Sequence, residues 1–217
     1  MTAISLFRVS TWCCEGVAGQ TDSLDIILYN DGRPIDIMLL QATQQPSPDI
    51  GADCRPPSVP LYLTISTLSE GYQMVESPAP EYDPSAGVAI YWRDLTVKGN
   101  PEKFESELAG RIIKLHLTWR ATRTSFSVVN FHGYSFGKKG NRSKIELLEL
   151  LRERKGLSRK KQNILGGNFN FVEQIQDRKR EGAEEAFHRE QQVRDFFINL
   201  SKNFQIKVTA DTDQERQ

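Results

Sequence analysis

The sequence predicts a mixed α/β fold in which two layered sheets are flanked by helices. Three observations carry this prediction: seven short runs rich in β-branched and apolar residues, a strand, helix, strand pattern near the start, and two amphipathic segments in the second half. Strands that alternate with helices at both ends, with hairpin-like runs between them, are typical of two packed sheets with helices outside. We therefore expect one four-layer α/β/β/α domain over residues 1–217.

Each of the seven runs predicts a strand. They cover residues 4–9, 35–41, 61–67, 87–92, 112–119, 126–131 and 163–166. Between the first two, residues 22–30 place three apolar side chains on one helical face, with Asp22 as a plausible N-cap and Gly32 just past the end. This pattern predicts a β-α-β opening.

Two helices are expected in the second half of the chain. From Asn141, a plausible N-cap, the spacing of Ile and Leu residues predicts an amphipathic helix that ends at Gly156. A second helix is expected over about residues 183–203. Prolines cluster in residues 46–60 and again in residues 78–84, and both stretches are expected to be loops.

The charge and cysteine content exclude several classes of protein. Lys plus Arg and Asp plus Glu each total 28, so a nucleic acid or a membrane surface would have to be bound by a local patch. The three cysteines are too few and too unevenly spaced for a disulfide framework or a paired-cysteine zinc site. No apolar run approaches the roughly 20 residues of a membrane span. We expect an intracellular protein with no membrane partner.

Four segments, in order along the chain, carry a resemblance to a known family. They read Thr-Trp-Cys-Cys-Glu-Gly at 11–16, Asp-Ile-Met-Leu-Leu-Gln-Ala-Thr at 36–43, Val-Val-Asn-Phe-His at 128–132 and Ile-Leu-Gly-Gly-Asn-Phe-Asn at 164–170. They resemble the conserved blocks of the endonuclease/exonuclease/phosphatase superfamily, among them Gln-Glu-Thr and Gly-Gly-Asp-Phe-Asn. The Phe-Val-Glu and Asp-Arg sequences that follow, within residues 171–178, are similar to the branch found in non-LTR (LINE-type) retrotransposons.

The resemblance implies a DNase-like fold and magnesium-dependent hydrolysis of a phosphodiester. In such enzymes hard oxygen ligands hold the Mg²⁺ ion. Here Cys13 stands at the position of a metal-binding Asn, Ala42 at that of the metal-binding Glu, and Asn168 at that of an Asp that orients the attacking water. Only His132 and Asn170 match the catalytic residues of the family.

The resemblance also implies a domain that stops before the last strands of the family. The terminal Ser-Asp-His block has no counterpart after Val208, so we expect an unpaired strand edge that another protein or RNA covers. With the metal-binding Glu and the general base missing, we predict no appreciable nuclease activity and weak or no Mg²⁺ binding. Whether the replacements arose by natural decay or were introduced to trap a complex stays open.

Several of these residues also fit ordinary structural roles. His132 can be a hydrogen-bonded residue at a strand end, and Asn168 and Asn170 can serve to shape a loop. Cys13 and Cys14 are predicted to be small buried hydrophobes rather than a metal or redox site. The three tryptophans are expected in the core or on sheet faces rather than as platforms for stacking bases: Trp12, Trp92 and Trp119.

A basic segment provides the candidate contacts to nucleic acid. Residues 137–161 hold ten Lys or Arg against three Glu, and more basic residues follow at 178–180. The candidates for binding phosphates of DNA or RNA are Lys138, Lys139, Arg142, Lys160, Lys161 and Arg178. An ordinary solvated helix face with i to i+4 ion pairs explains the same pattern equally well.

Two functions follow from these patterns. The first is a retrotransposon-type endonuclease domain that is catalytically impaired and would act in the nucleus or the cytoplasm. The alternative is a non-catalytic subunit, derived from that domain, that binds nucleic acid or has a structural role in a larger assembly. A phosphatase acting on a phospholipid or nucleotide is disfavoured by the retrotransposon-like continuation within residues 171–178.

Overall fold

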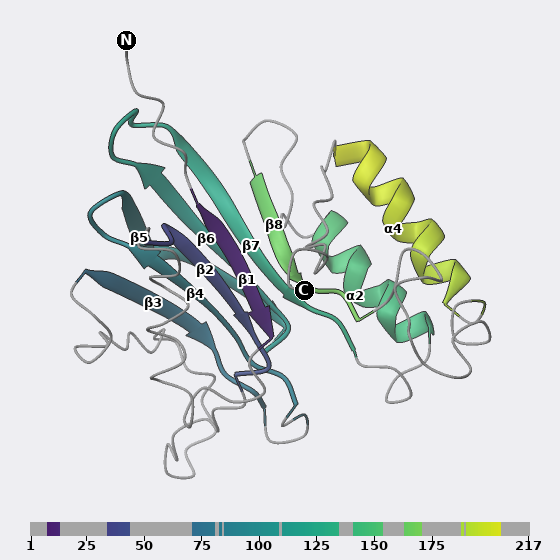
Figure 1. The fold of residues 1–217 in the computed structure, drawn as a ribbon. Coiled ribbons are helices and arrows are strands. Elements are labelled where there is room, and N and C mark those ends of the chain that lie inside the picture. The colour runs from purple at the N-terminus through teal and green to yellow at the C-terminus, as the bar shows by residue number, and fades with distance from the viewer. Residues whose placement is uncertain are drawn as a thin grey trace, which may run out of the picture. The chain divides into compact units, whose positions relative to one another are not determined.

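The computed structural model describes residues 8–13, 34–43, 71–80, 83, 85–108, 110–134, 141–153, 163–170, 188 and 190–204. The chain divides into two compact units, one formed by residues 1–138 with 160–170 and the other by residues 139–159 with 171–217. The first unit holds all the described strands, and the second holds two helices (Figure 1).

The first unit contains two four-stranded mixed sheets. One has the order β1-β2-β4-β3, with β1 parallel to β2 and the other pairs antiparallel. Its strands are β1 (Val9–Cys13), β2 (Ile37–Gln41), β4 (Val88–Arg93) and β3 (Tyr72–Ser77). The other sheet has the order β5-β6-β7-β8, and only β7 and β8 are parallel. Its strands are β5 (Val97–Leu108), β6 (Ile112–Trp119), β7 (Ser125–His132) and β8 (Asn163–Asn168).

The two sheets pack face to face around one apolar core. Alternate side chains along the strands point to the same face, so both sheets contribute one face to this core. Its buried members are Ile37, Leu39, Val75, Val88, Ile90, Trp92, Val97, Ile113, Leu115, Leu117, Phe126 and Val128. The unit is therefore a β-sandwich. Together with the helices of the second unit, the chain has the α/β, DNase-like class of fold that the sequence predicts.

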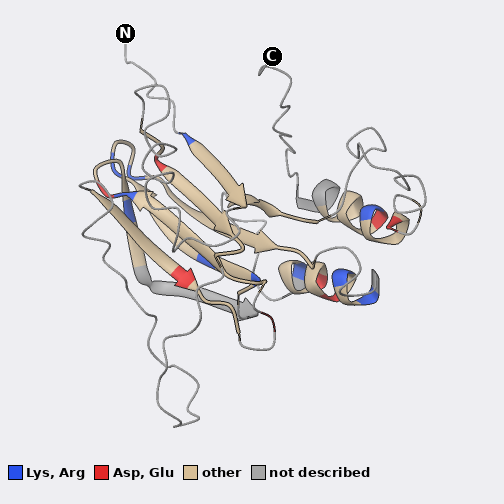
Figure 2. Ribbon diagram, turned by 60° about the horizontal axis from the view of Figure 1, so that its bottom comes forward, with Lys and Arg blue, Asp and Glu red and all other residues tan. Residues whose placement is uncertain are grey.

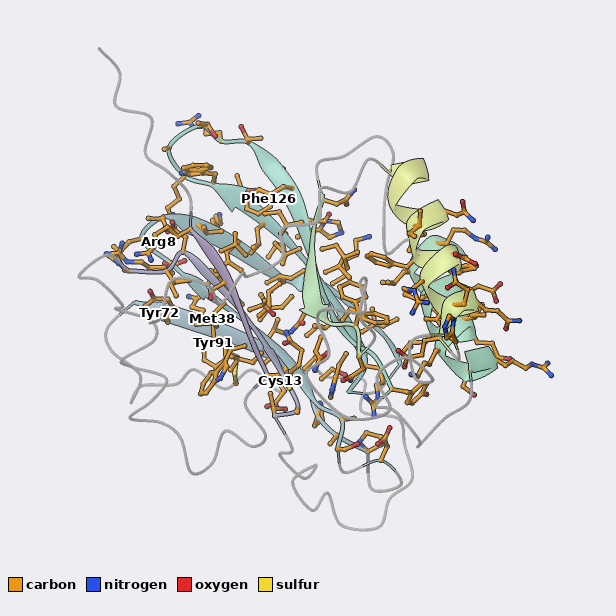
Figure 3. The ribbon with its side chains drawn as sticks, turned by 45° about the vertical axis from the view of Figure 1, so that its right-hand side comes forward. Arg8, Cys13, Met38, Tyr72, Tyr91 and Phe126 are labelled. Atoms are coloured by element: carbon orange, nitrogen blue, oxygen red, sulfur yellow. The ribbon has the colours of Figure 1, made fainter. Side chains whose placement is uncertain are left out.

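Strand β2 is buried on both of its faces. Its opposite face joins a second cluster that includes Met38, Tyr72 and Tyr91, which Figure 3 labels together on the first sheet. Every residue of β2 is buried. A strand with two covered faces has a continuous run of apolar residues rather than alternating apolar and polar ones. The sequence of β2 shows such a continuous run.

The second unit contains two helices that pack against each other, α2 (Asn141–Glu153) and α4 (Gln191–Phe204). Each helix buries one apolar stripe: Leu147, Leu148 and Leu151 on α2, and Val193, Phe197 and Leu200 on α4. A buried ion pair accompanies them, with Lys144 Nζ 2.7 Å from Glu190 Oε1. No helix among the described residues is long and apolar enough to span a membrane.

The strand predicted at 35–41 and the predicted strands after residue 80 are confirmed, with small differences at their ends. Residues 4–7 of the first predicted strand, at 4–9, lie outside the described residues, while β1 runs from Val9 to Cys13 and so contains the Thr-Trp-Cys motif that we expected to follow the strand. Two strands, β3 and β5, were not predicted. The predicted helix at Asn141 is confirmed, ending at Glu153, and the second helix runs from Gln191.

The remaining predictions fall on other parts of the chain. The helix expected at 22–30, the strand at 61–67 and the loop at 46–60 lie outside the described residues, as do residues 154–162 and 183–187. Within the described part, the edge strands are β1 and β3 of the first sheet and β5 and β8 of the second.

Candidate functional site

Four strands of the sandwich end at the same place. Cys13 ends β1 and pairs with Gln41 at the end of the parallel strand β2, while His132 ends β7 and pairs with Asn168 at the end of the parallel strand β8. The two sheets meet here, because the Asn168 side-chain amide donates a hydrogen bond to Cys13 Sγ at 3.5 Å. Figure 3 labels Cys13 at this end of β1. We call Cys13, Ala42, His132, Asn168 and Asn170 the strand-end site.

A buried amide network holds the two sheets together beside this site. Gln41 Nε2 donates to Asn130 Oδ1 of the other sheet at 2.7 Å, and Gln41 Oε1 accepts from the Thr11 hydroxyl at 3.2 Å. Asn130 Nδ2 in turn donates to the carbonyls of Leu40 and Ala89 at 2.7 and 2.8 Å. Both amides are almost fully buried, so these hydrogen bonds replace the water that each group loses on folding.

The two asparagines after β8 form a hydrogen-bonded turn. Asn168 Oδ1 accepts the backbone N–H of Asn170 at 2.9 Å, and Asn170 Nδ2 donates to the Gly133 carbonyl at 2.7 Å. Asn170 has a φ of 52°, a left-handed conformation that Asn adopts more readily than most residues. Both functional atoms of the Asn168 amide therefore have partners within the protein.

Close backbone packing positions this turn. Gly167 has a φ of 137°, and a Cβ atom there would collide with the Phe131 carbonyl oxygen of the neighbouring strand. A Cβ at Gly166 would lie 2.5 Å from Leu39 Cδ1, on the opposite sheet. The Phe131 and Phe169 rings stack with their centroids 4.8 Å apart. The two glycines thus let β8 approach both β7 and the first sheet.

Ala42 follows β2 in a left-handed turn. Its φ is 56°, which is sparsely populated for a residue with a Cβ, and it is buried. The next residue, Thr43, donates from its hydroxyl to Glu76 Oε1 on β3 at 2.7 Å. Burial raises the pKa of Glu76, and the hydrogen bond from Thr43 opposes this effect. This carboxylate belongs to the outer face of the first sheet, the face that carries Tyr72 and Met74.

His132 is buried and neutral at physiological pH. Its backbone N–H donates to the Arg111 carbonyl at 2.8 Å, and its Nδ1 has no hydrogen-bond partner among the described residues. Burial lowers the pKa of His132 to about 4, helped by repulsion from the Arg111 guanidinium and opposed by Asp83. The ring can therefore accept or donate a neutral hydrogen bond, but it does not supply positive charge at pH 7.

Arg111 is a buried cation that orders the chain after β7. Its guanidinium donates to Asp83 Oδ2, through Nε at 3.2 Å, and to the Gly133 carbonyl, through Nη1 at 3.1 Å. The guanidinium also lies over the Tyr134 ring, 4.7 Å from its centroid. Because these partners occupy the planar group on several sides, Arg111 acts as a positioning residue for the segment that follows His132.

The comparisons with known proteins agree with this architecture. No family model and no curated protein sequence matches the chain. Among solved structures, an AP endonuclease from Leishmania major superimposes with a TM-score of 0.58 at 19% identity, over 91% of this chain and 66% of that one. The fold is therefore that of the endonuclease/exonuclease/phosphatase superfamily. A humanized D. rerio TDP2 gives a TM-score of 0.50 at 15% identity, over 76% of this chain and 67% of that one.

These superfamily neighbours show the fold alone, since all the identities are low. The chain spans 66% of the length of the Leishmania enzyme. A Bacteroides thetaiotaomicron protein described as an endonuclease/exonuclease/phosphatase family member is also similar, with a TM-score of 0.49 at 15% identity over 83% of this chain and 67% of that one.

The described residues of the strand-end site do not fit a magnesium ion. Mg²⁺ prefers hard oxygen ligands, and at these positions Cys13 offers a soft sulfur and Ala42 offers only a methyl group. The one amide oxygen of Asn168 already accepts a hydrogen bond from Asn170. Nowhere in the described part of the chain do three His, Cys, Asp or Glu side chains gather as a metal cluster.

The structure brings the predicted site residues together but corrects one prediction. Cys13 is exposed and not buried as predicted, because it ends an edge strand whose side chains are exposed or half-buried. The expected placement of the tryptophans is confirmed: Trp92 is buried, and Trp12 and Trp119 pack against the two clusters.

Of the predicted basic contacts, only Arg142 is among the described residues. It lies on α2, is strongly exposed, and pairs with Glu146 at 3.0 Å in an i to i+4 ion pair, as a solvated helix face would. The other candidates lie outside the described residues: Lys138, Lys139, Lys160, Lys161 and Arg178.

The hydrogen bonds between Gln41 and Asn130 and the buried Arg111 were not predicted from the sequence. Asn130 left a signal, because an amide between the valines and phenylalanine of a core strand must find hydrogen-bond partners when buried. Gln41 occupies the Gln of the recognised block, but its partner lies 89 residues away in the chain. No sequence pattern marks Arg111, since its partners, Asp83 and Gly133, lie far from it in the sequence.

Proposed function

We propose that this chain is a LINE-type endonuclease-like domain that no longer hydrolyses phosphodiesters. The observation that carries the proposal is the turn at Ala42, a buried methyl group in a left-handed conformation where the resembled enzymes place the metal-binding Glu. A protein of this fold needs an ion to polarise the phosphate and activate water, and a methyl group cannot help to hold one.

The surrounding groups do not replace the missing chemistry. A general base must reach the attacking water, whereas His132 is buried with its pKa lowered to about 4. The Glu76 carboxylate is hydrogen-bonded to Thr43 on the outer face of the first sheet. Among the described residues, we therefore find no side chain placed to act as general base or to hold the metal ion.

A non-catalytic subunit that binds nucleic acid or supports a larger assembly is the second candidate. The specific observation in its favour is that the hydrogen bonds around the strand-end site are formed, although the residues at the metal-binding positions are replaced. The hydrogen bonds between Gln41 and Asn130 and between Asn168 and Asn170 are all formed. These intact hydrogen bonds fit a domain that keeps a role other than hydrolysis, inside the cell and with a protein or RNA partner along a sheet edge.

Nicking of supercoiled plasmid DNA tests the proposal. The full chain is incubated with Mg²⁺ or Mn²⁺, with and without EDTA, beside a matched His132→Ala/Asn170→Ala variant that reveals contaminating nucleases. We expect the two proteins to give the same background. Robust EDTA-sensitive nicking by the natural sequence that the double variant lacks would show that the domain is an active nuclease and refute the proposal.

A further inference from the structure

The end of the sandwich opposite the strand-end site carries a group of cations. It is formed where β1 and β2 begin, where the β4–β5 turn lies and where the β6–β7 turn lies. We call this group the basic rim; it consists of Arg8, Arg93, Lys98, Arg120 and Arg123. Figure 2 shows Lys and Arg colouring at the strand ends and turns of this end of the sheets, and Figure 3 labels Arg8 there.

Hydrogen bonds bring the chain segments that carry most of the basic rim close together. The Arg8 backbone N–H donates to Asp36 Oδ2 at 2.9 Å, and the Arg93 N–H donates to the Asp36 carbonyl at 2.9 Å. The neighbour of Arg93 is Asp94, whose Oδ1 accepts from Arg120 Nη2 at 2.9 Å. These contacts join the ends of four strands, β1, β2, β4 and β6, across both sheets.

The two remaining members lie beside Arg120. Lys98 is on β5, opposite Thr118 in the register with β6, and Arg123 is in the tight β6–β7 turn. The Arg120 N–H donates to the Thr96 carbonyl at 3.0 Å, which places the starts of β5 and of this turn together. Lys98 and Arg123 are exposed, so both cations are open to a partner.

The basic rim has a local excess of positive charge. Five cations face two carboxylates, Asp36 and Asp94, so the difference is three positive charges among the described residues. Asp36 is buried and accepts a backbone N–H, and Asp94 is paired with Arg120. Because the whole chain has equal numbers of acidic and basic residues, the excess is local.

We propose that the basic rim binds the phosphate backbone of a nucleic acid. Arg120 already donates to Asp94 through Nε and Nη2, whereas Arg123 is exposed, and its planar guanidinium group can donate two parallel hydrogen bonds to a phosphate. The exposed Thr124 hydroxyl of the β6–β7 turn, which accepts from the Thr122 hydroxyl at 2.8 Å, can donate a further hydrogen bond. Contacts of this kind recognise the backbone rather than the bases, so the binding is independent of sequence.

A bilayer or an apolar protein surface fits the basic rim less well. Among the described residues, the large hydrophobic side chains exposed there are Val9, at the start of β1, and Leu95, in the β4–β5 turn. Two isolated side chains offer little area for insertion or for a hydrophobic interface. A flexible polyanion, by contrast, needs only cations spaced along a surface.

This inference does not rest on the proposed function. Strand β1 begins next to Arg8 and ends at Cys13, so the basic rim and the strand-end site are separated by the length of a strand, roughly 13 Å at 3.3 Å per residue. No metal ion is needed to bind phosphates at the basic rim. The binding is therefore measured in EDTA, where hydrolysis by a metal-dependent site cannot contribute.

Fluorescence anisotropy with a fluorescein-labelled, mixed-sequence single-stranded oligonucleotide tests the inference. The full chain is compared with Lys98→Gln/Arg123→Asn across a series of NaCl concentrations. Asn is chosen because Arg123 has a φ of 57°, which Asn tolerates. The control is Arg152→Gln, which removes a positive charge from the exposed face of α2 at a residue that is not a candidate phosphate contact. Thermal melting verifies that all three proteins are folded.

We expect saturable, salt-sensitive binding by the natural sequence. The rim variant should bind about tenfold more weakly, and its slope of log Kd against log salt should be lower by about 1.4, or 0.7 for each lost phosphate contact. The α2 control should stay within about twofold of the natural sequence.

Three results would overturn the inference: no saturable binding, a rim variant that binds as tightly as the natural sequence, or an equal loss in the α2 control. Vesicles that contain phosphatidylserine are included as a second probe, and binding to them without binding to the oligonucleotide would also overturn it. Plasmid nicking on the same preparations reports the proposed function separately.

Discussion

The Asn168 side-chain amide, at the end of one sheet, donates a hydrogen bond to the Cys13 thiol, at the end of the other, over a distance of 3.5 Å. In the enzymes that this chain resembles, these two positions belong to the machinery that binds the metal ion and orients water. Here they satisfy each other, and the Asn168 oxygen caps the backbone of Asn170. Within the strand-end site, Cys13 and Asn168 therefore form a polar contact between the two sheets.

Removing the Asn168 side chain is expected to lower the free energy of unfolding by about 1 to 2 kcal/mol, because Asn168→Ala leaves the Asn170 N–H without its acceptor. Asn168→Asp keeps that acceptor and loses only the weak bond to the thiol, so its cost should be less than half as large. Urea denaturation measures both. Equal losses in the two variants would mean that the turn does not depend on this hydrogen bond.

The network of Gln41 and Asn130 is expected to be a major source of stability at this end of the sandwich. Asn130→Ala removes two donors and one acceptor from a fully buried position and leaves the Gln41 amide without its partner on the other sheet, so we expect a loss of about 3 kcal/mol. Gln41→Ala and the double variant complete a double-mutant cycle. Additive losses would contradict a direct coupling between the two amides.

The stability of the fold should fall in mild acid because of His132. Its pKa is lowered from 6.5 to about 4, so the unfolded chain takes up a proton in this interval that the folded chain does not. The contribution is complete above pH 6.5 and is lost as the pH falls through 4, in total on the order of 3 kcal/mol. Denaturant titrations at several pH values should show this slope, and His132→Gln should reduce it.

A Glu76 variant separates His132 from another titrating group. Glu76 works in the opposite sense: burial raises its pKa from 4.5, so its contribution is complete below 4.5 and is lost as the pH rises through the folded value. Glu76→Gln should therefore make the acid loss steeper. A slope that persists in His132→Gln would assign it to another group.

Gly167 is expected to tolerate no side chain. Gly167→Ala combines a positive φ with a collision between the new Cβ and the Phe131 carbonyl, so we expect it to cost at least about 3 kcal/mol or to prevent folding. Gly71→Ala is the matched control, because it has a φ of 105° but its nearest neighbour is Leu95 Cγ at 4.0 Å. Its cost should be the backbone strain alone, about 1 to 2 kcal/mol. Thermal melts of equal midpoint would contradict the collision.

The strands of the core could be predicted from the sequence because they are apolar and β-branched. Segments such as Ile112–Trp119 keep one face in the core, and local composition alone identifies them. The strands β3 and β5 were not predicted for a physical reason. In Tyr72–Ser77, the polar residues Gln73 and Glu76 break the apolar run, and a proline cluster follows the strand. In Val97–Leu108, Gly99 and a register shift after Asn100 interrupt the pattern of apolar residues that marks a strand.

The residues of the candidate site could be predicted from the sequence, but their exposure and their hydrogen bonds could not. The recognised blocks placed Cys13, Ala42 and Asn168 at strand ends, and the parallel pairs β1–β2 and β7–β8 bring these ends together. The exposure of Cys13 and its hydrogen bond to Asn168 depend on how the two sheets pack. That packing is a long-range property, which the local sequence pattern does not contain.

Binding of Mn²⁺ to the strand-end site tests the central claim most directly. Isothermal titration of the full chain with Mn²⁺ should show no saturable binding at millimolar concentrations. The variant Cys13→Asn/Ala42→Glu/Asn168→Asp, which restores two carboxylates and an amide, should bind Mn²⁺ more tightly than the natural sequence. Saturable binding by the natural sequence that His132→Ala/Asn170→Ala abolishes would contradict the claim that this site has lost its metal.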